Sequence, residues 1–151
     1  MEGSLNFPND ISRDGTTPRP ANESGAAAPS DDRAARLARL TLRKPEAEDG
    51  NAVNTLISNC APLDENSVYC NLLQCSHFSD TCVVAELDGE IVGFVSGYIV
   101  PDNEAHFFVW QVAVAEEARG LSLAKRMILD ILSRESTSGV KELHTTITPD
   151  N

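Results

Sequence analysis

The segment 106–132, HFFVWQVAVAEEARGLSLAKRMILDIL, constrains the fold of this chain more than any other segment. Residues 107–114 are almost all β-branched or aromatic, which is typical of a buried strand. From Ala124 onward the apolar residues recur at helical spacing, so a helix is expected to follow the strand. Two periods separated by a short acidic turn predict a strand–turn–helix unit in a domain whose helices cover a sheet.

The turn between this strand and this helix is a candidate anion site. The first N–H groups of a helix have no acceptor within the helix, and the helix dipole adds partial positive charge there. Lys125 and Arg126 add cations one turn later in a chain that is otherwise acidic. We therefore expect a phosphate-bearing cofactor at this turn. The expected cofactor-binding residues are Arg119, Gly120, Leu121, Ser122, Leu123 and Ala124.

Length and charge narrow the class of protein. A chain of 151 residues predicts one domain, and 41% hydrophobic residues suffice for a core. The net charge of -11 is the opposite of what a nucleic-acid-binding protein usually carries, so no nucleic-acid partner is expected. No window approaches the roughly 18 apolar residues of a membrane span, and the N-terminus lacks the pattern of a secretory signal. We expect a cytoplasmic protein without a membrane partner.

Cysteine and histidine spacing favours packing over metal chemistry. The four cysteines, at positions 60, 70, 75 and 82, form no CxxC pair, and the three histidines show no ligand spacing. We therefore expect no metal site, and reduced thiols that pack as small apolar groups.

Composition divides the chain near residue 37. Residues 1–36 contain four prolines, three glycines and many polar residues, and such a segment cannot offset the entropy of ordering. The sequence predicts a disordered tail over 1–36 and one domain over 37–151.

The other elements complete the order β-α-α-β-β-β-α-β. Asp88-Gly89 is a two-residue hairpin signal, and Gly93 and Gly97 in the second hairpin strand indicate a bulge or a close backbone neighbour. A β-α-β crossover into the last strand predicts a mixed sheet with helices on its faces, an α/β fold. The expected strands are 40–43, 82–87, 90–100, 107–114 and 140–147, and the expected helices are 46–60, one capped by Asn66 or Ser67, and one from 124 onward.

This order, with a V-A-V strand leading into R-G-x-x-x-A, resembles the GNAT acetyltransferase superfamily. The superfamily signature, Arg/Gln-x-x-Gly-x-Gly/Ala, falls on Arg119, Ser122 and Ala124. Ser122 stands in place of the first signature glycine and adds a side chain where a phosphate should approach. The resemblance implies acetyl-CoA as cosubstrate, with its pantetheine arm bonded to the backbone of Val112 and Val114 between the central and last strands.

Longer strings narrow the resemblance. PLDENSVYCNLLQCSHFSDTCVVAE, GEIVGFVSGYIVPDN, FVWQVAV and TTITPDN are similar to the L-2,4-diaminobutyrate acetyltransferase family, over about residues 40–151. The resemblance implies acetyl transfer to the 4-amine of L-2,4-diaminobutyrate in ectoine biosynthesis, by a homodimer. The family has glutamate in place of His144 and continues past the TPDN string, so the chain is expected to be truncated at its C-terminus.

The same match suggests residues for the acceptor. Asp64 and Asn66 are expected to bind the ammonium end, and Tyr69, little more than a helical turn beyond Asp64, is the candidate for proton transfer. Trp110, taken to be in phase with Phe108 and Val112, is expected to form an aromatic wall. Asn151 is expected to hydrogen-bond the substrate.

Several alternatives stay open at this point. Trp110 can be a core aromatic, and His144 fits an ordinary strand histidine better than a base. The fold also suits acetylation of another small amine, or a non-catalytic remnant that only binds the coenzyme.

Overall fold

The chain folds around one five-stranded sheet whose strands follow sequence order from edge to edge. The computed structural model describes residues 29–146. Neighbouring strands are antiparallel from β1 to β4, and β5 joins β4 in parallel, which confirms the predicted mixed sheet. The strands are β1 (Leu40–Arg43), β2 (Cys82–Leu87), β3 (Glu90–Val100), β4 (Asn103–Val114) and β5 (Glu142–Thr145).

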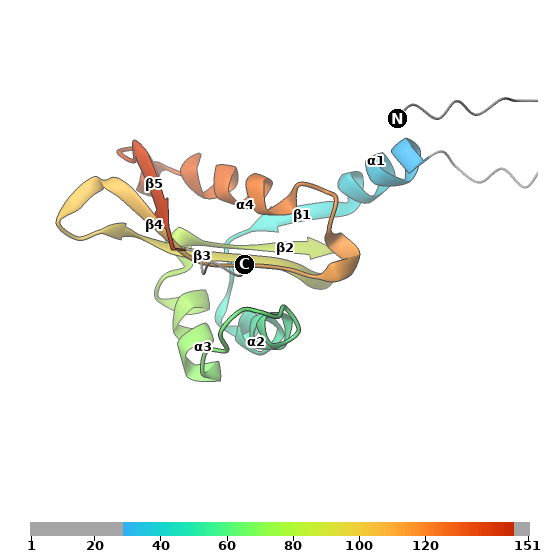
Figure 1. Cartoon of the computed structure of the whole chain (residues 1–151), viewed down its shortest axis with the longest axis horizontal. Helices are drawn as coiled ribbons and strands as arrows, with labels where there is room; N and C mark the ends of the chain where they lie inside the picture. Colours follow the sequence, from blue (N-terminus) through green and yellow to red (C-terminus); the bar gives the residue numbers. More distant parts are fainter. Residues whose placement is uncertain (1–28, 147–151) are drawn as a thin grey trace, which may run out of the picture.

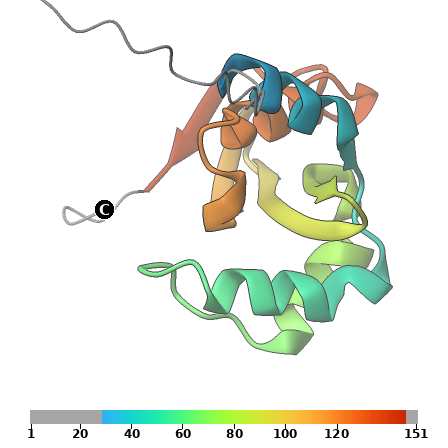
Figure 2. The same cartoon turned by 90° about the vertical axis from the view of Figure 1, so that its right-hand side faces the viewer.

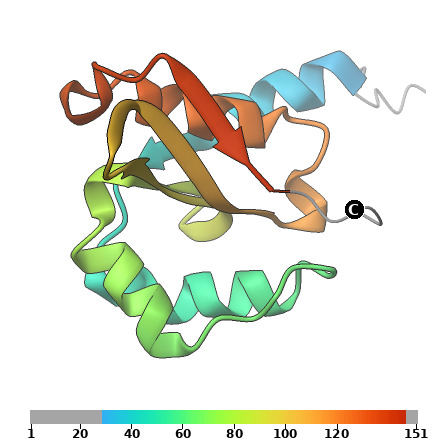
Figure 3. The same ribbon diagram turned by 60° about the vertical axis from the view of Figure 1, so that its left-hand side comes forward.

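Helices cover both faces of the sheet. Figure 1 shows α4 on one face and the pair α2 and α3 on the other, an arrangement that Figure 3 repeats from a second direction. Among the described helices, none combines the length and the apolar character needed to cross a membrane. The helices are α1 (Pro29–Arg39), α2 (Gly50–Ser58), α3 (Val68–Ser76) and α4 (Leu123–Leu132).

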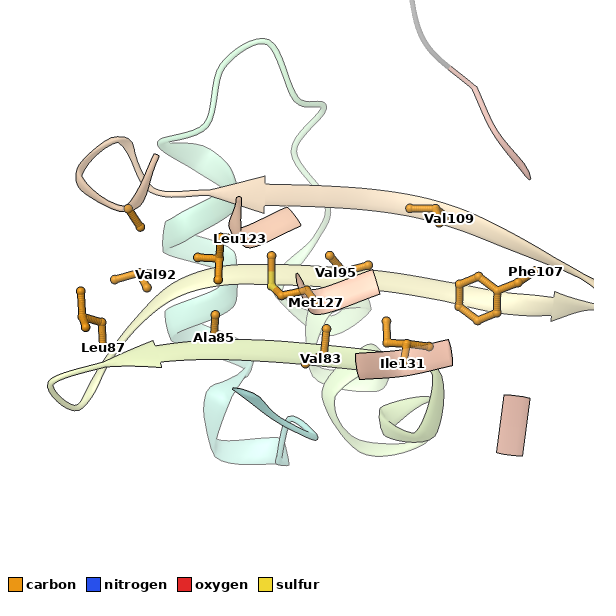
Figure 4. Close-up of a cluster of buried hydrophobic side chains, with 11 residues drawn as sticks. Val83, Ala85, Leu87, Val92, Val95, Phe107, Val109, Leu123, Met127 and Ile131 are labelled. Carbon is orange, nitrogen blue, oxygen red and sulfur yellow. The ribbon is translucent and has the colours of Figure 1, made fainter. Parts of the chain in front are cut away.

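The core on the α4 side explains the helical spacing of that segment. Leu123, Met127 and Ile131 recur every four residues, are at most 2% exposed, and lie on the strands beneath them (Figure 4). Full burial of such a side chain contributes about 1.5–3 kcal/mol to folding. Val83 of β2 and Val95 of β3 are among the sheet residues that pack against these three side chains.

On the opposite face of the sheet, a second core is formed by the residues of β2 and β3 that alternate with those of the first core. Val84 and Phe94 pack there against Ile57 of α2. Cys75 and Cys82 belong to this core, and burial raises the pKa of each thiol to about 12, which confirms the prediction that these cysteines pack as apolar groups. Because both faces of β2 and β3 are buried, these strands appear in the sequence as nearly continuous apolar runs.

The helix α1 was missed in the sequence. The prediction of a disordered tail over 1–36 is wrong for residues 29–36, and residues 1–28 lie outside the described part. Amino-acid composition did not indicate this helix, because α1 is held to the domain by contacts of its arginines rather than by buried apolar side chains. Arg33 and Arg36 donate to backbone carbonyls of the turn before α4, and Arg39 pairs with Asp88 at 2.8 Å.

Polar contacts fix where the next two helices begin. The predicted helix 46–60 starts as a short 3-10 turn, and Asp49 there accepts from Arg43 and from the N–H of Glu46. The Arg43 guanidinium holds the pKa of the Asp49 carboxyl below its usual range. Ser67, not Asn66, caps α3, because its hydroxyl accepts from the N–H of Cys70 at 3.1 Å.

A bulge in β4 changes which residues share a face. Gly97 of β3 pairs with Val109 and Ser96 pairs with Gln111, so Trp110 has no partner in the register. One extra residue reverses the alternation that follows it. Val109 and Val112 consequently both pack on the α4 side, and the prediction that Trp110 is in phase with Val112 is wrong.

Gly97 makes this bulge possible. A Cβ at position 97 would lie 2.4 Å from the Phe107 ring and 2.6 Å from the carbonyl oxygen of Phe108. The prediction of a bulge or close neighbour at this glycine is confirmed.

We expect Gly97→Ala to lower the free energy of unfolding by about 1–3 kcal/mol, because the added methyl forces the Phe107 ring and the backbone apart. Gly139→Ala is the matched control, since a Cβ there meets nothing within 4 Å. Urea denaturation measures both variants. Equal stability of the two would contradict the close packing at Gly97.

Candidate active site

The edge of β4 that faces β5 is paired at its start and open beyond. The parallel register runs only from His106↔Glu142 to Val109↔Thr145, where the Thr145 hydroxyl donates to the Val109 carbonyl at 3.1 Å. Within residues 29–146, no strand pairs with 110–114 on this edge. Figure 2 shows β5 leaning away from the other strands. The two strands therefore enclose a notch that widens toward the end of β4.

Backbone groups of β4 point into this notch. Ala115 donates its N–H to Val92 of β3 at 2.9 Å, so the alternation along a strand turns the N–H and C=O groups of Val114 and Val112 to the opposite, open edge. The Val114 carbonyl also accepts from the Cys60 thiol at 3.5 Å. Val112 and Val114 are the two residues predicted to bind an extended cofactor arm. Their orientation suits that role, which stays a prediction.

A hollow of about 240 Å³ occupies the notch. Trp110 lines it and is 57% exposed, which excludes the alternative that this indole is a core side chain. The hollow is built from four parts of the fold, and its other lining residues include Leu63 of the α2–α3 loop, Val112 of β4, Ile128 of α4 and Thr145 of β5.

A network of side-chain amides holds the α2–α3 loop against β4. Gln111 is 7% exposed, accepts from the Asn66 amide at 2.8 Å and donates to the Asp64 carbonyl at 3.0 Å. The Asn66 amide also reaches Asn71, which in turn donates to Asn54. Gln111 was overlooked in the sequence, although a glutamine within an otherwise apolar strand is a signal of a buried polar contact.

The predicted acceptor residues divide into two groups. Asn66 is engaged within the fold, where it fixes the loop to Gln111. Asp64 has an exposed side chain, and Tyr69, 68% exposed on the first turn of α3, lines neither hollow beside Trp110. Asn151 lies outside the described residues. The binding and catalytic roles of these residues stay predictions.

A second, apolar hollow adjoins Trp110 on the α3 side. It holds about 220 Å³ and is lined by Leu73 of α3, by Phe78 just after this helix and by Tyr98 of β3. The Tyr98 and Trp110 rings meet edge to face, 6.4 Å between centroids. Trp110 therefore separates two cavities and can present its indole to either.

Every second residue of the predicted phosphate-binding turn is buried in the core. Leu121 and Leu123 are each 2% exposed and anchor the turn in the core, whereas Gly120 and Ser122 face outward with φ of 79° and 56°. Ser122 precedes α4, and its hydroxyl makes no capping hydrogen bond. The first N–H groups of α4 are therefore left without a side-chain cap, as an anion site requires.

More cations gather at this turn than the sequence indicated. Arg126 donates to the Leu121 carbonyl at 3.3 Å, and from α1 Arg33 donates to the Gly120 carbonyl at 3.2 Å. Arg36 reaches the Glu117 carbonyl beside them. The signal for α1 was the spacing of its arginines, which recur every three residues and so share one helical face.

Comparison of the chain with known proteins identifies its family. A model of the acetyltransferase (GNAT) family matches residues 51–151. The chain belongs to the GNAT acetyltransferase family. The GNAT likeness extends to a solved aminoglycoside N-acetyltransferase, 18% identical with a TM-score of 0.60 over 74% of this chain and 79% of that one, which supports the fold alone.

Closer relatives of this GNAT chain share one name. L-2,4-diaminobutyric acid acetyltransferase of Methylotuvimicrobium alcaliphilum is 55% identical over 74% of this chain and 65% of its own, and that of Vibrio parahaemolyticus is 50% identical over 73% and 61%. Diaminobutyrate acetyltransferase EctA of Paenibacillus lautus, solved with L-2,4-diaminobutyric acid and coenzyme A, is 43% identical, with a TM-score of 0.72 over 74% of this chain and 68% of that one. The chain spans somewhat under two thirds of the length of the two curated relatives.

We expect Gln111→Leu to lower the free energy of unfolding by about 1–3 kcal/mol, because it removes the partner of the Asp64 carbonyl and one of the two partners of the Asn66 amide. Thr146→Ala, an exposed change beside the same notch, is the control and should stay within about 0.5 kcal/mol. Urea denaturation compares them. A neutral Gln111→Leu would show that the amide network does not hold the loop.

Ser122→Gly should be more stable than Ser122→Ala by about 1 kcal/mol, because only glycine adopts positive φ without a Cβ penalty. The two variants share the loss of the hydroxyl, so their difference isolates the backbone. Thermal unfolding of both, beside the unchanged protein, measures it. An alanine variant as stable as the glycine variant would contradict the left-handed conformation at this position.

Proposed function

We propose that this chain transfers the acetyl group of acetyl-CoA to the 4-amine of L-2,4-diaminobutyrate, a step of ectoine biosynthesis. The observation that carries the proposal is the open edge of β4. It offers backbone donors to an extended thioester directly beside Trp110 and the anchored α2–α3 loop. The choice of acceptor is supported by the relatives, which are named for this substrate.

The coenzyme would lie along the notch and end at the phosphate turn. Val112 and Val114 would bond the pantetheine arm, and the N–H groups of residues 120–124 would hold the diphosphate. The outward backbone of Gly120 and Ser122, with Arg119 exposed beside them, suits a dianionic group in an otherwise acidic chain. The bound thioester supplies the activated acetyl group.

The acceptor would enter between Trp110 and the α2–α3 loop. Diaminobutyrate carries two ammonium groups and one carboxylate, and a chain of net charge -11 attracts such a cation. The exposed Asp64 carboxylate can pair with an ammonium, and the Trp110 indole can cover the methylene chain and a cation. We infer that Asn66 contributes by fixing this loop, and that Asn151 hydrogen-bonds the substrate.

Transfer requires a neutral amine. A free alkyl ammonium has a pKa near ~10, so the site must remove a proton before the nitrogen attacks the acetyl carbon. The N–C bond then forms, the C–S bond breaks, and the thiolate takes a proton. Tyr69 is proposed to carry these protons through water, which its exposed phenol can reach. The N–H of Val112 would polarise the acetyl carbonyl.

The assembly and the compartment are also part of the proposal. By family resemblance the enzyme is a homodimer, and acetyl-CoA as cosubstrate favours the cytoplasm. Light scattering on the full chain gives the mass of the particle, and a monomer at working concentration would remove the dimer without affecting the chemistry.

The decisive experiment mixes the full chain with acetyl-CoA and diaminobutyrate and follows thiol release, with NMR to identify the acetylated nitrogen. We expect the N4-acetyl product. Tyr69→Phe should lower kcat by at least about 100-fold if the phenol moves the proton, and Tyr98→Phe, the other tyrosine, should change it little. Trp110→Ala should mainly raise KM for the amine.

The other outcomes distinguish the alternatives. Faster turnover of another diamine or of an aminoglycoside would replace the acceptor while keeping the fold. Coenzyme A binding by calorimetry without turnover of any amine would favour the non-catalytic remnant. Absence of coenzyme binding would remove the proposed site.

A further inference from the structure

Three side chains of metal-ligand type meet on one face of the sheet, and none of them lines the hollow in the notch. His106 lies on β4, and Glu142 and His144 lie on β5. The parallel register pairs His106 with Glu142, and His144 follows two residues later, so all three project from the same face. No metal site was expected from the sequence because the histidines and cysteines lack ligand spacing along the chain. That spacing does not show which residues the pairing of β4 with β5 brings together.

The geometry of the three groups suits a small cation. The Glu142 carboxylate oxygen Oε2 lies 3.4 Å from Nε2 of His106 and 3.3 Å from Nε2 of His144. Ligand atoms bound at about 2.0–2.1 Å around a tetrahedral ion lie about 3.3 Å from one another. The imidazole rings stack with centroids 4.5 Å apart, and the Nε2 atoms of both approach the same carboxylate oxygen.

Asn103 contacts the same imidazole. Its amide nitrogen lies 3.1 Å from Nε2 of His106. Nε2 has a single lone pair, so a metal bound there takes the place of the Asn103 amide, and the exposed Asn103 side chain has to turn away. The ring proton then stays on Nδ1, the tautomer in which Nε2 binds a metal.

We propose that His106, Glu142 and His144 bind a divalent transition-metal ion of the zinc class, with the remaining coordination positions open to water. Two imidazoles and one carboxylate are a ligand set that Zn²⁺ accepts, and imidazole also suits Ni²⁺ and Cu²⁺. One ring nitrogen of each histidine and a carboxylate oxygen of Glu142 lie within 4.8 Å of one another, and rotation of the rings closes the remaining gap. The His144 side chain is 46% exposed and that of His106 28%, which leaves room for this rotation.

The ion would tie β5 to β4 through side chains. The backbone register joins these strands over four residue pairs, and the site lies at the start of that pairing. A ligand that binds only the folded chain stabilises it. Metal binding therefore raises the melting temperature, independently of any acetyl transfer.

The test titrates the full chain with Zn²⁺ alone by calorimetry. We expect one ion per chain, and His106→Ala or His144→Ala should weaken binding by more than about tenfold, as loss of a metal partner does. His77→Ala is the matched control, since His77 is the remaining histidine and is exposed at the end of α3. Glu142→Gln keeps the shape of the strand and removes the charge, so it tests the site if an alanine variant unfolds.

Two further readouts distinguish this site from zinc bound elsewhere on the chain. Co²⁺ should give a spectrum without a thiolate charge-transfer band, because no cysteine belongs to the site. Zn²⁺ should raise the melting temperature of the unchanged protein and of His77→Ala, but not of His144→Ala. The proposal is overturned by a thiolate band, by unchanged affinity in the His106 and His144 variants, by an equal loss in His77→Ala, or by no binding at all.

Discussion

Gly97 lets the Phe107 ring approach the backbone of β3, where any other residue would place a Cβ 2.4 Å from that ring. The register between β3 and β4 slips by one residue at this point, and Trp110 is the residue left over. The slip has two consequences for the site. It turns the backbone of Val112 and Val114 to the open edge, and it directs Gln111 at the α2–α3 loop. One missing side chain on β3 therefore determines how β4 can meet a ligand.

The phosphate turn shows the same dependence of an exposed site on buried contacts. Leu121 and Leu123 are held in the core, so the intervening Ser122 must face outward. The serine adopts a left-handed conformation that glycine would adopt at less cost, and it does so at the position where the family signature has glycine. The cations gathered here, including Arg33 from α1, stand out against the acidic chain.

Strong periodicity made most elements predictable. The strand of residues 107–114 and the helix after it were expected because a change of apolar period reflects burial on two faces and then on one. The hairpin at Asp88-Gly89 was expected because an Asp-Gly pair tolerates the positive φ that such a turn needs, and both residues adopt it. The helix α1 was missed because it is held by arginines that donate to backbone carbonyls. Amino-acid composition does not indicate which residues such arginines will contact.

The sequence by itself determined the order of the elements from β1 onward, the two-sided core, the turn before α4 and the family, because each depends on neighbours within a few residues or on long matching strings. The tertiary structure alone decided which side chains meet. It engaged Asn66 with Gln111, exposed Trp110 at a bulge, and brought His106 beside His144 across a parallel register. Those contacts join residues that lie far apart in the chain, and a single slipped residue in the pairing of two strands would have rearranged all of them.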